Sequence, residues 1–564
     1  MSPRRPLDLL RPAPVLLLAA VFLEAISWAV GGGAGTTTFA WYRVQAHAGT
    51  TGLLLTFAAG LTAGGLAWGL LRSWPGVGTW FEGRRGVLLL GLAALALHLA
   101  FLDLPQAQPD TVNYFVYAQH FARDPLGTLS AWPSMAWGGP EASFHHPFPL
   151  VPLIYGLAFR LAGERWAVIE ALLALFAVAL PLAVAWVGRC AEQARIGLLA
   201  GWLMLGIPFL QCQTGWFLVD VPLLLLLCLA WGAMLRARSP GGLALALLAC
   251  LPALCTKASA GLFLAGPLAA MATQHRAVAR RWTLPLLALA GLGLLIWLYP
   301  PRLRDDPSTW LEALAATGIH LRPSLWLLGL PVLLGRGRLE RTAAGVLLSL
   351  PVILLYAPPE HCPRYALPLA IALGLAAALR LRPAGPGAAA LVASGLALCF
   401  SGYRPLLVHN QAANLQHATR AMEASGVSAI EVWSDQPGTN FAPAALAALV
   451  DLYAQVPVRF GGTLGLGEPE SKRHWWEVYE PPAWHQPVPG EPAPDGVMLC
   501  LFGADATAFE QGPGQDLDLI EQISLYRSSS MLLPQRVQLY RRRAAGPVSG
   551  QIPVFSGERS AQPD

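Results

Sequence analysis

Long apolar runs alternate with short polar stretches from Ala13 to about Phe400. Runs of this length with few internal charges are typical of helices that cross a bilayer with a hydrocarbon core about 30 Å thick. The pattern predicts about thirteen membrane spans when the long run around Lys257 is counted as two. The predicted segments are Ala13–Val30, Leu53–Leu71, Val87–Leu102, Val168–Val187, Ile196–Leu210, Phe217–Leu235, Leu243–Met271, Leu284–Tyr299, Leu321–Leu334, Ala343–Tyr356, Ala366–Leu379 and Ala388–Phe400.

The run Leu243–Met271 is interrupted by Lys257 and has basic residues on both sides, so the chain enters and leaves the membrane on the same side. Roughly thirty residues of helix extend about 45 Å, which is too short for two crossings of a core about 30 Å thick. We therefore predict a short hairpin whose tip, with Lys257, lies below the outer surface. A cation at that depth needs a cavity or a partner.

Basic residues gather on alternate loops, and such loops face the cytoplasm in membrane proteins. The basic clusters are Arg4/Arg5/Arg11, Arg72/Arg84/Arg85, Arg189/Arg195, Arg236/Arg238, Arg276/Arg280/Arg281, Arg336/Arg338/Arg341 and Arg380/Arg382. The long segment Asp103–Arg165 and everything after Ser401 are then external. Short loops and the lack of an organelle signal favour a multi-pass protein of the bacterial plasma (inner) membrane.

The chain after about Arg404 has ordinary polarity. Short apolar runs at Ala429–Trp433, Val456–Phe460, Val497–Phe502 and Val537–Tyr540 predict strands, and His417–Ser425 and Pro443–Ala454 predict helices. The expected domains are two N-terminal spans as an added module (1–85), a membrane region (86–403, with the external loop 103–165), an external α/β domain (404–543) and a disordered tail (544–564).

Composition agrees with a membrane protein and excludes a nucleic-acid-binding one. Hydrophobic residues make up 55% of the chain and charged residues 13%, against about 25% charged in soluble domains. The net charge is only +5, and the basic residues are dispersed over many loops. We expect membrane lipids, and no nucleic acid, among the partners.

Five groups of polar or proline-containing residues flank the apolar runs on the predicted external side. In chain order they are Asp110 with Tyr114; His145-His146-Pro147-Phe148-Pro149-Leu150; Asp220 with Pro222 and Leu223; Thr256-Lys257; and Arg364-Tyr365 with Pro368. In this order they resemble the motifs of the GT-C glycosyltransferases, specifically the protein mannosyltransferase and aminoarabinose transferase superfamily. The resemblance covers about Val87 to Phe400 and implies a GT-C-like, polytopic α-helical membrane fold.

The resemblance implies an enzyme that moves a sugar from a polyprenyl-phosphate carrier to an external glycan, lipid or protein acceptor by one inverting displacement. Such a transfer requires a base for the acceptor proton, and the candidate catalytic residues are Asp110, as that base, and Asp220. Negative charge develops on the leaving phosphate, so nearby cations would stabilise it. Candidate substrate-binding residues are Tyr114, His146, Lys257, Arg364 and Tyr365.

The chain departs from the family pattern in three ways. Thr111 follows Asp110 where many members have Glu, His145 and His146 stand where Glu and Lys are common, and two spans precede the resembling region. Some members bind a divalent ion, so a metal stays open, with His145, His146 and His320 as candidate ligands. These three lack the spacing of a metal motif, and no other cofactor is implied.

Each candidate also has an ordinary structural interpretation. Asp110 is then a solvated loop acid, and Asp220 caps a helix, where a carboxylate is favoured electrostatically. Lys257 would extend to the interface, and Arg364 would pair with Glu360 at a loop surface.

Three other functions are considered. A transporter or flippase of lipid-linked sugars predicts repeats and broken helices, and neither is clear in the sequence. A non-enzymatic envelope scaffold gives Asp110 and Lys257 no role. An enzyme similar to O-antigen ligases needs a large late external loop, whereas the large loop here comes early.

Overall fold

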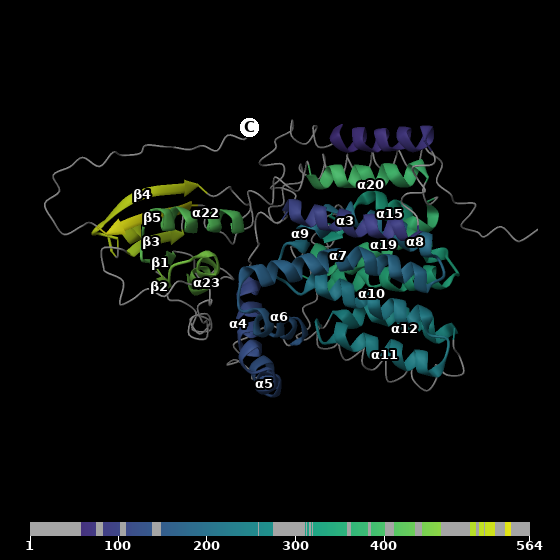
Figure 1. The fold of residues 1–564 in the computed structure, drawn as a ribbon, viewed down its shortest axis with the longest axis horizontal. Coiled ribbons are helices and arrows are strands. Elements are labelled where there is room, and N and C mark those ends of the chain that lie inside the picture. The colour runs from purple at the N-terminus through teal and green to yellow at the C-terminus, as the bar shows by residue number, and fades with distance from the viewer. Residues whose placement is uncertain are drawn as a thin grey trace, which may run out of the picture.

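The computed structural model describes residues 58–74, 83–101, 109–137, 148–257, 259–274, 311, 313–314, 317–318, 320–357, 362–381, 385–400, 411–434, 443–463, 497–502, 507–512, 514–524 and 536–542. Figure 1 shows a helical bundle on one side and a sheet with its helices on the other. The predicted spans Ala13–Val30 and Leu284–Tyr299 lie outside the described residues.

The bundle is organised around α7 (Trp166–Cys190), which packs against α3 (Gly83–Phe101), α8 (Ala194–Leu205) and α10 (Asp220–Arg236). The 25 residues of α7 are enough to cross a bilayer, because a helix rises about 1.5 Å per residue. Further bundle helices are α9 (Pro208–Thr214), α11 (Pro240–Leu254), α12 (Ala260–Gln274), α15 (Pro323–Gly329), α16 (Arg338–Leu347), α17 (Leu350–Tyr356), α18 (Cys362–Tyr365), α19 (Leu367–Arg380) and α20 (Pro386–Leu398), and residues 58–73 are also helical.

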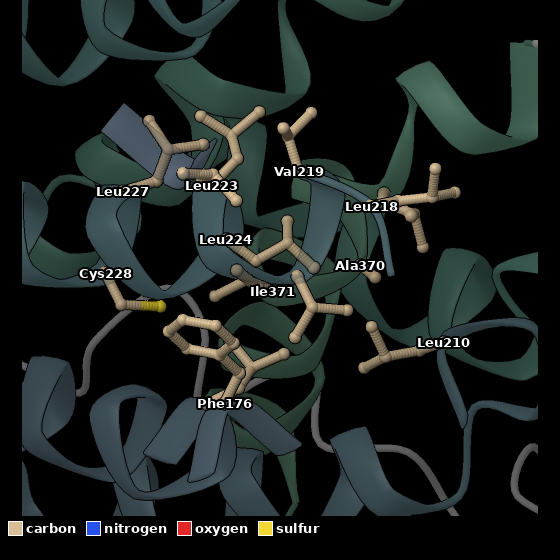
Figure 2. Packing of buried hydrophobic residues seen from close by; sticks show 14 of the residues in the cluster. Phe176, Leu210, Leu218, Val219, Leu223, Leu224, Leu227, Cys228, Ala370 and Ile371 are labelled. Carbon is tan, nitrogen blue, oxygen red and sulfur yellow. The ribbon is translucent and has the colours of Figure 1, made fainter. Parts of the chain in front are cut away.

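The core around α10 is apolar on several sides. Figure 2 shows Leu224 of α10 close to Phe176 of α7 and Ile371 of α19. All three are buried, and α10 packs against both neighbouring helices. Dense packing of this kind resists small displacements, so the first turn of α10 is held firmly.

The predicted hairpin is present. Helices α11 and α12 are each 15 residues long, or about 22 Å, and a short turn containing Lys257 joins them. The Ser239 hydroxyl caps α11 by accepting a hydrogen bond from the Gly242 backbone N–H at 3.1 Å. Each helix is shorter than a full span, as the prediction requires.

Two predicted spans are interrupted. The segment predicted as Leu321–Leu334 forms α15 and then the 3-10 turn η4 (Leu330–Leu334), and the segment Ala343–Tyr356 is divided between α16 and α17. Pro331 and Pro351 lie at the start of η4 and α17. Proline has no backbone N–H and cannot continue the helical hydrogen-bond ladder.

The segment predicted to be a long external loop contains three helices. These are α4 (Pro109–Arg123), α5 (Pro125–Trp137) and α6 (Leu150–Ala162). In Figure 1, α4 and α5 run across one end of the bundle, and α6 lies beside α4. Helix α4 is rich in buried aromatic side chains, including Tyr114, Phe115, Tyr117 and Phe121, which explains why this loop has structure of its own.

Leucines that point away from the bundle identify its environment. Each of the following is more than half exposed: Leu66, Leu88, Leu92, Leu175, Leu245, Leu248, Leu334 and Leu348. Proteins in water rarely expose so much apolar surface, so the chain is an integral membrane protein. Two described helices, Gly83–Ala100 and Trp166–Cys190, are long and apolar enough to cross a bilayer by themselves, and seven apolar helices are shorter. The count of about thirteen spans stays a prediction.

The C-terminal region has a five-stranded sheet in the order β2-β1-β3-β5-β4. Its strands are β1 (Ala429–Ser434), β2 (Val458–Thr463), β3 (Val497–Phe502), β4 (Leu517–Ser524) and β5 (Arg536–Arg542). Strand β1 is parallel to β2 and β3, and β5 is antiparallel to β3 and β4. Helix α22 (Gln411–Ala424) precedes β1, and α23 (Pro443–Tyr453) connects β1 to β2, as a parallel pair requires.

Four of these strands lie at the predicted positions, but β4 was not predicted. Its residues Leu517–Ser524 mix acids with apolar residues, and Leu519 and Ile520 are both more than 40% exposed at the edge of the sheet. An edge strand has less need of a buried face, so its alternation is weak. The predicted domain limits and the external location of this region stay predictions.

Candidate active site

Asp220 is the centre of a buried charge cluster at the start of α10. The residue is 3% exposed, and both of its carboxylate oxygens accept hydrogen bonds. Oδ1 accepts from Lys257 Nζ at 2.8 Å, and Oδ2 accepts from Arg364 Nε at 2.7 Å. A helix N-terminus favours a carboxylate, but it does not explain two cations converging on one buried acid.

The α11–α12 turn carries Lys257 to Asp220. The Thr256 hydroxyl donates to the Pro252 carbonyl at 2.8 Å, and the Lys257 carbonyl accepts from the Ala260 backbone N–H at 3.0 Å. The Leu150 backbone N–H donates to the Cys255 carbonyl at 3.2 Å, which attaches the start of α6 to the same turn. The turn is therefore fixed on both sides of Lys257.

Arg364 and Tyr365 approach from the short helix α18, directly before α19. Lys257 Nζ lies 4.4 Å from the centre of the Tyr365 ring, in a cation–π arrangement. Such contacts are attractive when the cation is partly desolvated. The ring therefore covers one side of the lysine, while Asp220 holds the other.

Among the described residues, the Asp220 carboxylate pairs with two cations, Lys257 and Arg364. The Asp220 side chain is 4% exposed, whereas those of Lys257 and Arg364 are 17% and 15% exposed. Removing charges from water is costly, and buried ion pairs are a weak means of stabilising a fold. Cations that keep some access to solvent are suited to binding an anion.

Helix α4 joins this region through Phe217, three residues before Asp220. The Thr111 hydroxyl donates to the Phe217 carbonyl at 3.3 Å. The Phe217 ring lies 6.5 Å from the Tyr114 ring and 4.1 Å from the Tyr155 ring. Asp110 belongs to the first turn of α4, next to Thr111, and its side chain lies outside the described residues.

The structure thus brings together four of the predicted site residues, Asp220, Lys257, Arg364 and Tyr365. Tyr114 is 1% exposed and reaches the region through Phe217. Arg364 pairs with Asp220, and the predicted alternative partner Glu360 lies outside the described residues.

Of the three metal candidates, only His320 lies within the described residues. His320 is buried and packs against Phe209, with the ring centres 4.8 Å apart and the planes tilted by 44°. No group of three His, Cys, Asp or Glu side chains is placed to hold a metal within the described part of the chain. His145 and His146 lie outside it, so the phosphate role of His146 and the metal roles stay predictions.

Two buried polar residues were missed by the sequence reasoning. Gln213 is 1% exposed, and its amide atoms have no hydrogen-bond partner among the described residues. Arg322 is also 1% exposed and donates to two backbone carbonyls. The apolar runs beside both residues are the signal that could have found them, because a polar residue next to a span is costly unless it has a role.

Comparison with known proteins gives similarity in structure alone. No protein-family model and no curated protein sequence matches the chain. ArnT from Cupriavidus metallidurans bound to undecaprenyl phosphate is 15% identical, with a TM-score of 0.49, over 83% of this chain and 100% of that one. Its apo structure is 14% identical, with a TM-score of 0.49, over 80% of this chain and 97% of that one.

A third similar structure is the arabinofuranosyltransferase AftD from Mycobacteria. It is 16% identical, with a TM-score of 0.43, over 82% of this chain and 40% of that one.

Proposed function

We propose that this protein is a membrane glycosyltransferase that takes a sugar from a polyprenyl-phosphate carrier and transfers it to an acceptor outside the cytoplasm. The observation that carries the proposal is the Asp220–Lys257–Arg364 cluster. Lys257 is 37 residues and Arg364 is 144 residues from Asp220 in the sequence, yet the three side chains meet in this cluster. Their joint order is also what the sequence resemblance rests on.

Lys257 and Arg364 are proposed to bind the phosphate that joins the sugar to its lipid. Their side chains keep about one-sixth of their surface exposed, while Asp220 beneath them is almost fully buried. When the bond from the sugar to the phosphate breaks, the leaving phosphate gains negative charge. Cations already held in place stabilise that charge without reorganising during the reaction.

Asp220 is proposed to orient these two cations. Both of its oxygens already accept hydrogen bonds, which supports a positioning role over a role as proton acceptor. The catalytic role predicted for Asp220 from the sequence stays a prediction. In this role the Asp220 carboxylate fixes the positions of the Lys257 and Arg364 side chains, and it affects the reaction only through them.

Asp110 is proposed as the base. Its place in the first turn of α4, beside Thr111 and close in sequence to Tyr114, puts it on the helix that adjoins Phe217. In the step, the acceptor oxygen forms a bond to the anomeric carbon while the bond from that carbon to the phosphate oxygen breaks. Asp110 takes the acceptor proton, and polyprenyl phosphate leaves with the electron pair.

A flippase of lipid-linked sugars is the second candidate. The interruption between α16 and α17 supports it, because transporters often place broken helices at their binding sites. A flippase moves the intact lipid-linked sugar, whereas a transferase breaks the bond between the sugar and the phosphate. The two functions therefore differ in their products.

The test uses the full-length protein in lipid nanodiscs with a set of polyprenyl-phosphate sugars and a crude envelope extract as acceptor. Mass spectrometry follows the release of free polyprenyl phosphate and the gain of sugar mass on an acceptor. We expect both products with the wild-type protein, and at least about a hundredfold less with Asp110→Asn. Sugar movement across vesicles with no bond cleavage for any donor would instead support the flippase.

A further inference from the structure

The bundle and the C-terminal region meet at Trp166, the first residue of α7. The Trp166 indole N–H donates to the Leu452 carbonyl at 2.6 Å. Its ring stacks on that of Tyr453, with centres 5.8 Å apart and planes 12° from parallel. Leu452 and Tyr453 end helix α23, which connects β1 to β2.

Helix α4 lies at the same junction. Helix α23 packs against α4, and the Gln119 amide of α4 donates to Glu164 Oε1 at 3.0 Å, two residues before Trp166. Helix α23 is itself firmly packed in the C-terminal region, since its residues Ala447, Leu449 and Val450 are at most 1% exposed. The C-terminal region therefore contacts α4 through α23.

The first turns of α4 contact Phe217, which is close in sequence to Asp220 of the charge cluster. Thr111 donates to the Phe217 carbonyl and Tyr114 lies against the Phe217 ring, and Phe217 is three residues from Asp220. Helix α4 is thus held near its first turn by Phe217 and farther along by Glu164, and α23 also packs against it. A 15-residue helix transmits a displacement of one part to the other because its backbone is rigid.

We infer that the C-terminal region is a clamp for α4, and that Trp166 is a positioning residue that closes the clamp. The indole N–H and the ring stacking fix α23 beside α4, and α4 in turn sets the position of Asp110 relative to Lys257 and Arg364. The effect on transfer rests on the proposed function. The clamp itself is a property of the fold and is measurable without it.

Two full-length variants separate the two contacts of Trp166, and a third variant is the control. Trp166→Phe keeps a ring on Tyr453 and loses the N–H donor, while Trp166→Ala loses both. The matched control is Trp433→Phe, which removes an indole N–H that donates to Glu431 Oε1 at 2.7 Å inside the C-terminal sheet. Trp433 makes the same kind of bond without joining the two regions.

Hydrogen exchange of the α4 amides, read by mass spectrometry, tests the clamp. One lost hydrogen bond corresponds to about fivefold faster exchange if opening of α4 requires it to break. We expect about fivefold for Trp166→Phe, more than about tenfold for Trp166→Ala, and no change for Trp433→Phe. Unchanged α4 exchange in Trp166→Phe overturns the clamp, and this variant serves even if Trp166→Ala does not fold.

Transfer kinetics test the positioning role. We expect Trp166→Ala to lower kcat about tenfold while the KM for the donor changes less than about twofold, because the base moves and the phosphate site does not. Faster α4 exchange with unchanged kcat overturns the positioning role. Absence of transfer in the wild-type protein would defeat the proposed function, while the exchange data would still decide on the clamp.

Discussion

Arg322 and Arg364 are both largely removed from water, but their surroundings differ. Arg322 is 1% exposed, and its Nη1 donates to the carbonyls of Gly206 and Leu391, each at 3.1 Å. Gly206 follows α8, and Leu391 belongs to α20. Arg364 instead pairs with the Asp220 carboxylate, and 15% of its side chain is exposed.

The space around Arg322 is closed. A Cβ at Gly395 would collide with its guanidinium, and one at Gly206 would stand 2.8 Å from Nη1. Gly206 and Gly395 let the chain approach the arginine closely, and its Nη1 donates to two backbone carbonyls. Around Arg364 the partner is an acid shared with Lys257, and both cations keep some exposure. The difference is between a cation that fastens helices and cations that can accept a further anion.

The largest expected effect follows from Arg322→Ala. The substitution leaves the Gly206 and Leu391 carbonyls without this donor and opens a cavity, at a cost of about 2–4 kcal/mol in the free energy of unfolding. Thermal unfolding in detergent is the measurement, and polyprenyl-phosphate binding by the folded fraction should be unchanged.

The control for this substitution is Arg238→Ala, whose arginine pairs with Glu192 and is 62% exposed. Exposed pairs contribute about 0–1 kcal/mol, so this variant should melt near the wild type. Equal melting of the two variants would contradict the fastening role of Arg322.

Asp220→Asn has a smaller effect on stability and a distinct one on function. The neutral amide no longer balances Lys257 and Arg364, so we expect a loss of about 1–3 kcal/mol in the free energy of unfolding. Because the two cations lose their common anchor, transfer should fall more than about tenfold. Full transfer activity in this variant would reduce Asp220 to a helix cap.

Much of the bundle was predictable because span positions depend on apolar runs that are visible in a single sequence. The hairpin around Lys257 was predictable from the basic residues on both sides of the run and from its length, since α11 and α12 together are too short for two crossings. The interruptions at η4 and between α16 and α17 were not predicted, because a proline in an apolar run is compatible with either a kink or a break.

The site was predictable in its members but not in its connections. Motif order pointed to Asp220, Lys257 and Arg364, yet their convergence on one carboxylate depends on how α10, the hairpin turn and α18 pack. The space around the Arg322 guanidinium is bounded by Gly206 and Gly395, which are 189 positions apart in the sequence and become neighbours only in the fold. The contact of Trp166 with α23 is equally remote in sequence, at a separation of 286 residues.

The central claim is that Lys257 and Arg364, oriented by Asp220, bind a phosphate carried on a lipid. The most direct test measures the Kd of a polyprenyl phosphate and of the matching neutral polyprenol for the wild-type protein, Lys257→Gln, Arg364→Gln and the control Arg238→Gln. We predict that the wild type and the control prefer the phosphate, and that each site variant loses about tenfold in phosphate affinity with unchanged polyprenol affinity. A phosphate preference that is the same in all four proteins would contradict the account.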